Sequence, residues 1–260
     1  MVDASLTEDA GVLTVTFDRQ DKRNAVSDEM LAVLVEGIDR LREDDSARVL
    51  VIQAVGKYFT SGVDLNGATA RRMEERTESA FPDQFFRKVH RSIHRIFDEI
   101  EAIEKPVVLA AQGPCWGIGV ELATVCDFRF CSPAATFALP EIQIGVLPGS
   151  GGTGRLTRLI GPAWTKWLAV AGQRIDAERA LQIGLVHEVV EGDLVARVEE
   201  FAQELVALPG EAVGIGLIAV DMCADIDRTS QRHVERIINT NLFGSPEFVR
   251  RTARFTNGGE

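Results

Sequence analysis

Val49-Leu50-Val51-Ile52 is a run of four apolar, mostly β-branched residues, which is typical of a strand that is covered on both faces. Upstream, Val12–Phe17 (Val-Leu-Thr-Val-Thr-Phe) alternates as a half-buried strand does. Between the two, Ser27 is a good N-cap for a helix with apolar residues at spacings of three and four: Met30, Leu31, Leu34, Ile38 and Leu41. Strand, helix and strand within the first 55 residues predict an α/β fold.

The same pattern returns along the chain. Further apolar β-type runs lie at 107–111, 128–131 and 186–190, with helical patterns such as 98–103 and 177–183 between them. Beyond these, helical pattern dominates, at 194–208, 212–223 and 228–242. No linker rich in proline or serine divides the chain, so we predict an α/β core over residues 1–200 and a helical C-terminal region over residues 201–260.

Length and charge exclude several classes of protein. The 260 residues are ample to bury a continuous core. A net charge of −11 repels nucleic-acid phosphates, so we expect no nucleic-acid partner. The longest apolar stretch, 212–220, is about half of the ~20 residues that a bilayer span needs. The acidic N-terminus lacks the basic and apolar regions of a secretory signal, so we expect a cytoplasmic protein without a membrane partner.

No metal-ligand pattern is found in the sequence. The four cysteines form no CxxC pair, so no cysteine spacing indicates a zinc site or a redox motif. His90 and His94 are four residues apart on an expected helix but lack the glutamate of HExxH. We interpret this pair as part of a solvated helix face and predict no metal site.

Three glycine-bearing clusters stand out, at 59–65, 113–122 and 148–154. Glycines allow tight turns that leave backbone N–H groups free to point at a ligand. The second cluster runs into a helical stretch, so free amides near Ile118 would lie at a helix N-terminus, which favours an anion or an incipient oxyanion.

Two carboxylates follow these turns. Glu121 lies within the first helical turn after the second cluster, and Glu141 follows Pro140 in an apolar setting. A carboxylate among apolar neighbours tends to have a raised pKa, which suits proton transfer near neutral pH. The structural alternatives are a helix-dipole acid for Glu121 and a salt-bridged acid for Glu141.

Taken in order over residues 10–190, these motifs resemble the enoyl-CoA hydratase/isomerase (crotonase) family. The matching stretches are Asp21-Lys22-Arg23-Asn24-Ala25, the 59–65 cluster, Lys105-Pro106, Gly117 to Asp127, Pro140-Glu141 with Gly145, the 148–156 loop, and Ala180 with Gly184-Leu185-Val186. The resemblance implies a spiral of ββα units, a helical trimerisation region, and a homotrimer or dimer of trimers acting on acyl-CoA thioesters.

The resemblance also implies roles for individual residues. The oxyanion hole would be the backbone N–H groups of Val63 and Ile118, and CoA contacts would come from around Arg23, Ala25, Ser61 and Val63. Trp116, Gly117 and Gly149 would line the substrate pocket.

Both hydratase glutamates are present in this sequence. Glu121 would position and deprotonate a water, and Glu141 would be the main acid that delivers a proton to Cα of a trans-2-enoyl thioester. No metal or redox cofactor is implied, since coenzyme A is part of the substrate. Two close carboxylates should titrate as a coupled pair.

Related reactions remain open. Enoyl isomerases of the family typically lack the first glutamate, and dienoyl isomerases and dehalogenases carry an aspartate at the place of Gly149, so hydration is favoured. Ile118 stands in the middle of the family's usual triple glycine and could narrow the thioester slot. The alternatives are an isomerase, lyase or C–C hydrolase acting on a branched or aromatic acyl-CoA, and a non-catalytic acyl-CoA-binding or RNA-binding member of the fold. A set of phenylalanines is equally consistent with an acyl pocket and with plain core: Phe81, Phe85, Phe86 and Phe97.

Overall fold

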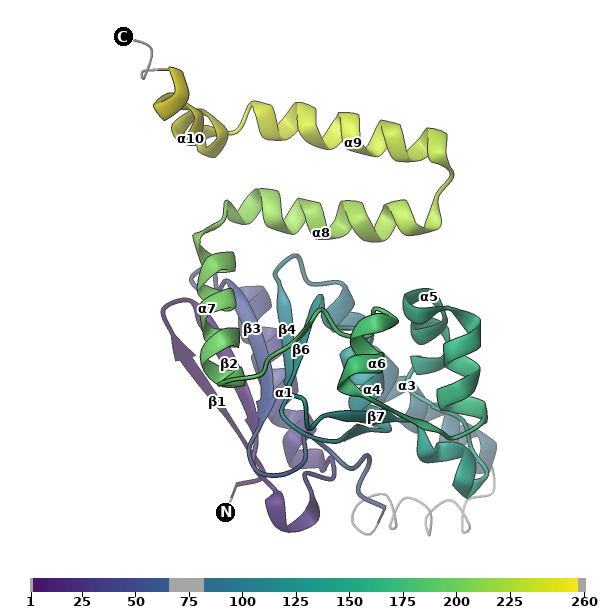
Figure 1. The fold of residues 1–260 in the computed structure, drawn as a ribbon. Helices are drawn as coiled ribbons and strands as arrows, with labels where there is room; N and C mark the ends of the chain where they lie inside the picture. Colours follow the sequence, from purple (N-terminus) through teal and green to yellow (C-terminus); the bar gives the residue numbers. More distant parts are fainter. Residues whose placement is uncertain (1, 66–81, 257–260) are drawn as a thin grey trace.

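The computed structural model describes residues 2–65 and 82–256; the side chains of residues 82–90, 92 and 254–256 lie outside that description. A central sheet runs through the body of the molecule (Figure 1). Its order is β1-β2-β3-β4-β6-β9, with β1 and β2 antiparallel and all other neighbours parallel. The strands are β1 (Ala4–Asp9), β2 (Val12–Phe17), β3 (Val49–Ala54), β4 (Val107–Ala111), β6 (Phe128–Cys131) and β9 (Glu188–Val189).

A second, three-stranded sheet has the order β5-β7-β8. Its strands are β5 (Cys115–Trp116), β7 (Thr136–Ala138) and β8 (Arg174–Asp176). The register aligns Trp116 with Ala138, and Ala138 with Arg174. This sheet matters for the site because β5 ends immediately before Gly117.

Helices connect and cover the strands. They are α1 (Asp28–Glu43), α3 (Pro82–Glu101), α4 (Ile118–Ala123), α5 (Gly152–Thr165), α6 (Ala177–Gln182), α7 (Leu194–Ala207), α8 (Gly210–Asp225), α9 (Arg228–Phe243) and α10 (Pro246–Thr256). Short helical turns lie at Gln20–Lys22, Pro140–Ile144 and Lys166–Val170.

The first strand–helix–strand unit confirms the sequence prediction. Ser27 caps α1 by accepting a hydrogen bond from the Met30 N–H at 3.2 Å. Strand β3 is buried on both faces, because its residues alternate between two cores. Leu50 and Ile52 belong to the core under α1, whereas Val49 and Val51 pack in a second core under α7.

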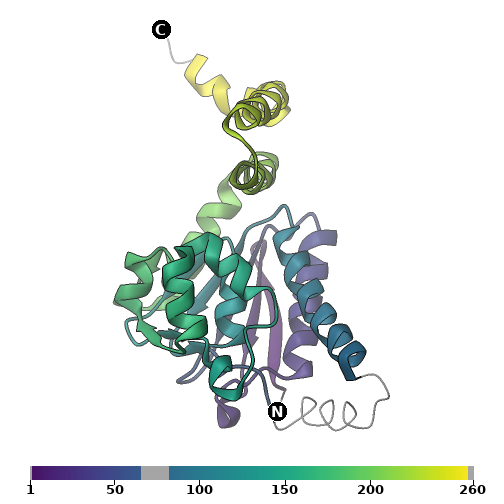
Figure 2. The same cartoon turned by 90° about the vertical axis from the view of Figure 1, so that its right-hand side faces the viewer.

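The C-terminal helices leave this body. Figures 1 and 2 both show α8 and α9 lying side by side outside the layers that surround the sheet. Within the described chain, several large apolar side chains of α8, α9 and α10 are exposed: Ile218, Val220, Met222, Ile237, Phe243, Phe248 and Val249. Across residues 2–65 and 82–256 no single helix has the length and apolar character to cross a membrane, and α7 with α8 meet that test only as a pair bent by 104°.

Candidate functional site

Two glycine turns, at Gly62 and Gly117, lie next to each other because the segments that precede them are paired. The Thr60 N–H donates to the Pro114 carbonyl at 3.1 Å, and the Trp116 N–H donates to the Thr60 carbonyl at 3.0 Å. Because the segments run parallel, Gly62 and Gly117 meet at their ends: a Cβ on Gly117 would lie 3.4 Å from the Gly62 Cα. The amides that follow these two glycines are therefore neighbours.

Those amides are the backbone N–H groups of Val63 and Ile118. Gly117 has a φ of 58°, a conformation that favours glycine, and its own N–H donates to the Ala138 carbonyl at 2.8 Å. Helix α4 begins at Ile118, as expected. Among the described residues neither the Val63 nor the Ile118 N–H finds a hydrogen-bond acceptor. Two unpaired donors thus lie on neighbouring turns, and the side chain of Val63 beside them is exposed.

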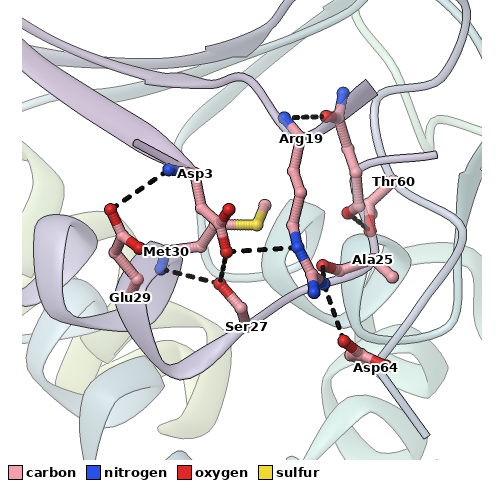
Figure 3. Close-up of polar contacts among 9 residues, drawn as sticks. Asp3, Arg19, Ala25, Ser27, Glu29, Met30, Thr60 and Asp64 are labelled. Carbon is pink, nitrogen blue, oxygen red and sulfur yellow. Dashed lines mark hydrogen bonds and ion pairs between the residues drawn. The ribbon is translucent and has the colours of Figure 1, made fainter. Parts of the chain in front are cut away.

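A polar network around Arg19 holds the glycine turn at Gly62 in place (Figure 3). The Arg19 guanidinium bridges Asp3 at 3.1 Å and Asp64 at 2.7 Å, and donates to the Ala25 carbonyl at 3.0 Å. The Val26 N–H donates to the Gly62 carbonyl at 2.9 Å. The network ties the loop before α1 to the turn that presents Val63.

Asn24 is a residue whose part in this network was not foreseen from the sequence. The residue is 1% exposed. The carboxamide oxygen accepts from the Arg19 N–H at 2.7 Å, and the amide nitrogen donates to the carbonyls of Val55 at 3.0 Å and Tyr58 at 2.7 Å. The only sequence signal for this role was its place in the Asp21–Ala25 motif.

The residues expected around CoA lie together in these loops. Arg23 is exposed, and its guanidinium lies over the Tyr58 ring at 5.8 Å from the centroid. The Ser61 N–H donates to the Arg23 carbonyl at 3.0 Å. Ala25 is two residues further on and half-buried. The structure therefore brings Arg23, Ala25 and Ser61 next to Val63.

Glu121 is buried on α4, with 3% of the residue exposed. Its Oε1 accepts from the N–H groups of Ser150 at 2.7 Å and Gly152 at 3.2 Å. Burial raises the pKa of Glu121, while these two amides, the Ser150 hydroxyl and the charge of His94 lower it, with a net rise. The carboxylate is held by amides of the 148–152 loop, an arrangement that a helix-dipole acid would not need.

Glu141 lies in the turn Pro140–Ile144, which follows β7. Its Oε1 would be 2.8 Å from a Cβ on Gly117, so the carboxyl group stands against the second glycine turn. Its Oε2 is buried without a partner among the described residues, and none of the ion pairs found there includes Glu141. Burial first, and repulsion by Glu121 second, raise the pKa of Glu141 to about 7. Among the described residues, then, no ion pair supports the salt-bridged alternative for this carboxylate.

The expected pocket residues are placed as follows. Gly117 lies between Gly62 and Glu141, and Gly149 is half-buried in the loop that holds Glu121. Trp116 is half-buried; its indole N–H donates to Thr136 Oγ1 at 3.1 Å, and its ring packs edge-on against Tyr58. Phe97 and the side chain of Ile118 are buried in the main core, which favours the plain-core reading of Phe97 and weighs against a slot narrowed by Ile118. Phe81 and the side chains of Phe85 and Phe86 lie outside the described residues.

His94 corrects one sequence expectation. It was expected on a solvated helix face, but it is half-buried on α3, and its charge acts on Glu121. Its Cε1 would lie 3.4 Å from a Cβ on Gly151. The i, i+4 spacing with His90 could not indicate the contact of His94 with the 148–152 loop, because only the tertiary fold brings α3 to that loop. The side chain of His90 lies outside the described residues. Within the described part of the chain, no group of three or more His, Cys, Asp or Glu residues could hold a metal ion.

Comparison with known proteins identifies the family of the chain. The family model described as enoyl-CoA hydratase/isomerase matches residues 7–250. A probable mitochondrial enoyl-CoA hydratase 2 from Arabidopsis thaliana is 33% identical over 249 residues, covering 95% of this chain and 79% of the relative. A carnitinyl-CoA dehydratase from Salmonella typhi is 36% identical over 204 residues, covering 77% of this chain and 73% of the relative.

A solved enoyl-CoA hydratase from Bacillus anthracis superposes with a TM-score of 0.86 at 26% identity, covering 98% of this chain and 96% of that one. The crotonase-like α/β fold with a helical C-terminal region, expected from the sequence, is confirmed by this likeness. The chain belongs to the enoyl-CoA hydratase/isomerase, or crotonase, family of enzymes.

Proposed function

We propose that this protein is an enoyl-CoA hydratase, which adds water across the double bond of a trans-2-enoyl-CoA to give a 3-hydroxyacyl-CoA. The observation that carries the proposal is that two carboxylates lie near a pair of unpaired backbone amides: Glu121 is buried on the helix that begins at Ile118, and the half-buried Glu141 stands against the turn at Gly117. Its relatives named enoyl-CoA hydratase and carnitinyl-CoA dehydratase support a hydro-lyase reaction on an acyl-CoA.

The two amides act on the thioester carbonyl. When water attacks Cβ, electrons move through the conjugated system and negative charge builds on the thioester oxygen. The N–H groups of Val63 and Ile118 stabilise that charge, an interaction worth roughly 3–4 kcal/mol per donor in other enzymes. They need no side chain for this, so valine and isoleucine are tolerated at these positions.

The two carboxylates divide the proton transfers. Both amide hydrogen bonds of Glu121 fall on Oε1, and we assign Oε2 to hold the water and take its proton. Glu141 has a pKa of about 7 and so is partly protonated at neutral pH; it delivers a proton to Cα. Water is thereby added in full, its hydroxyl group at Cβ and a hydrogen at Cα. General acid–base assistance of this kind contributes about 10²–10⁴-fold.

The rest of the site orients the substrate. Arg23, Ala25, Ser61 and Val63 contact the CoA part, with Arg23 supplying positive charge to a phosphate. Trp116, Gly117 and Gly149 border the acyl thioester. Each proton transfer is assigned to a side chain, so the proposed mechanism calls for no metal and no redox cofactor.

We further propose that the working form is a homotrimer or a dimer of trimers. The exposed apolar residues of α8 and α9, such as Ile237 and Phe243, give a surface that a second copy of the chain can cover. Light scattering coupled to size exclusion, on wild type and on Phe243→Asp, tests this; a monomeric wild type would contradict it.

The test of the reaction is product identification with a panel of trans-2-enoyl-CoAs of increasing chain length. The hydratase proposal predicts a 3-hydroxyacyl-CoA as the product. A shifted double bond, a shortened acyl chain or free acid from the same panel would instead support the isomerase, lyase or C–C hydrolase alternative.

A further inference from the structure

The side chain of Arg155, on α5, hydrogen-bonds to the loop that holds the Glu121 carboxylate. Its Nη1 donates to the Ser150 carbonyl at 2.9 Å. The N–H of that same residue donates to Glu121 Oε1 at 2.7 Å. Ser150 therefore links the guanidinium to the carboxylate through a single residue.

The other edge of the guanidinium is anchored on a different helix. Its Nε donates to Glu101 Oε2 at 2.8 Å, and its Nη2 donates to Asp98 Oδ1 at 2.6 Å, both on α3. With the Ser150 carbonyl, these acceptors engage all three guanidinium nitrogens, which holds the arginine in one orientation. The Arg155 side chain is largely buried although both acids reach solvent.

The loop is shaped to admit this side chain. Gly151 has a φ of 86°, and a Cβ there would overlap Nη1 of Arg155. Gly152 in turn leaves the space that Glu121 fills. The two glycines let both Arg155 and Glu121 approach the same short segment closely.

We propose that Arg155 is a positioning residue for the reaction, which fixes the Ser150 and Gly152 amides and through them the orientation of the Glu121 carboxylate. This inference rests on the proposed function, in which Glu121 is the base. A misplacement of about 1 Å in a reacting group can cost about 10²-fold in rate, so a side chain that touches no substrate can still govern turnover.

The predicted signature is a change in Glu121 itself. The groups that face Glu121 are the Ser150 and Gly152 amides, the Ser150 hydroxyl, His94 of α3 and Glu141. The amides lower the pKa of Glu121, so loosening them raises it while burial is unchanged. A purely structural arginine elsewhere on α5 would leave this titration as it is.

The experiment compares Arg155→Met and Arg155→Lys with Arg158→Met. Arg158 lies on the same helix and pairs with Asp225 at 3.1 Å, with both side chains exposed. It is therefore a control for losing an ion-paired arginine from α5. The pKa of Glu121 is measured by NMR on protein with ¹³C-labelled glutamate carboxylates, assigned with Glu121→Gln, and kcat and KM are measured with crotonyl-CoA.

For Arg155→Met we expect a higher pKa of Glu121 and a kcat reduced by about 10²-fold, with KM little changed. Arg155→Lys keeps the charge but replaces the planar guanidinium by a single nitrogen, so its pKa of Glu121 and its kcat should lie between those of Arg155→Met and wild type. It also serves as the test if the methionine variant does not fold. An unchanged pKa and kcat in Arg155→Met, or an equal change in Arg158→Met, would overturn the proposal. A wild type that hydrates no enoyl-CoA would refute the proposed function, whereas the NMR titration would still decide on Arg155.

Discussion

A Cβ atom on Gly152 would stand 2.5 Å from Cγ and 2.7 Å from Oε1 of Glu121, so the carboxylate occupies space that exists only because residue 152 is a glycine. Gly152 is also the first residue of α5, and its N–H is one of the two backbone donors to Glu121. Gly152 thus provides both the space that the Glu121 carboxylate occupies and one of its hydrogen bonds.

Gly152→Ala should accordingly reduce turnover. The new methyl group displaces the carboxylate, and we expect kcat for enoyl-CoA hydration to fall by about 10²-fold, the scale of a misplaced reacting group. Gly154→Ala is the matched control, since a Cβ there meets nothing within 4 Å and alanine favours a helix by roughly 0.5–1 kcal/mol over glycine. Equal kcat values in the two variants would contradict the account.

Ile118→Pro tests the second amide of the oxyanion hole. Ile118 is the first residue of α4, where proline is tolerated because its missing N–H breaks no bond within the helix. We expect kcat to fall by roughly 10²–10³-fold while the circular dichroism spectrum stays unchanged. Ile118→Val keeps the amide and should retain activity; loss in both variants would assign the effect to the side chain instead.

The raised pKa of Glu141 predicts the pH dependence of hydration. The acid must be protonated, so kcat/KM should decline as the pH rises through about 7. At the low end, protonation of Glu121 should reduce kcat/KM, at a pH above the usual range for glutamate because burial raises its pKa. The two limbs belong to the coupled pair and are measured as a pH–rate profile. A profile flat from pH 6 to 9 would be inconsistent with Glu141 as the acid.

Stability gives an independent check on the same group. The folded pKa of about 7 exceeds the ordinary value of 4.5, so the folded state binds the proton more tightly and the free energy of unfolding falls as pH rises across that window. Glu141→Gln removes this loss. At pH 8 we expect the variant to be more stable than wild type by on the order of 2 kcal/mol, after allowing for partial solvent exposure, in urea unfolding; at pH 4 the difference should vanish.

Asn24→Ala should destabilise the fold. It leaves the Val55 and Tyr58 carbonyls and the Arg19 N–H without their partner, and we expect a loss on the order of 3 kcal/mol in urea unfolding. Asn24 has a φ of 52°, so Asn24→Gly separates the two causes, because glycine adopts this conformation freely. A glycine variant as stable as wild type would show that backbone strain, and not the hydrogen bonds, explains the alanine result.

The sequence predicted the parallel sheet well because its strands are apolar runs flanked by helical periodicity, as in β3 and α1. It did not predict the antiparallel edge strand β1, and it also missed β5, β7 and β8, which are two or three residues long. Such strands are too short to show an alternation, and they form only because the chain brings Trp116, Ala138 and Arg174 into one register.

The residues of the site also fall into those that the sequence could indicate and those that it could not. The glycine turns and the two glutamates could be named from local motifs. His94, Asn24 and Arg155 could not, because their roles arise from segments that meet only in the folded chain: α3 with the 148–152 loop, and the loop before α1 with residues 55–60.

The most direct test of the central claim is loss of absorbance at the conjugated enoyl-thioester band, followed with trans-2-enoyl-CoAs for wild type, Glu121→Gln and Glu141→Gln. Glutamine keeps the size of each side chain but removes its ability to exchange a proton. The account predicts rapid loss of absorbance with wild type and at least a 10²-fold slower rate with each variant. Near-wild-type turnover of every accepted substrate by either variant would contradict two-glutamate hydration.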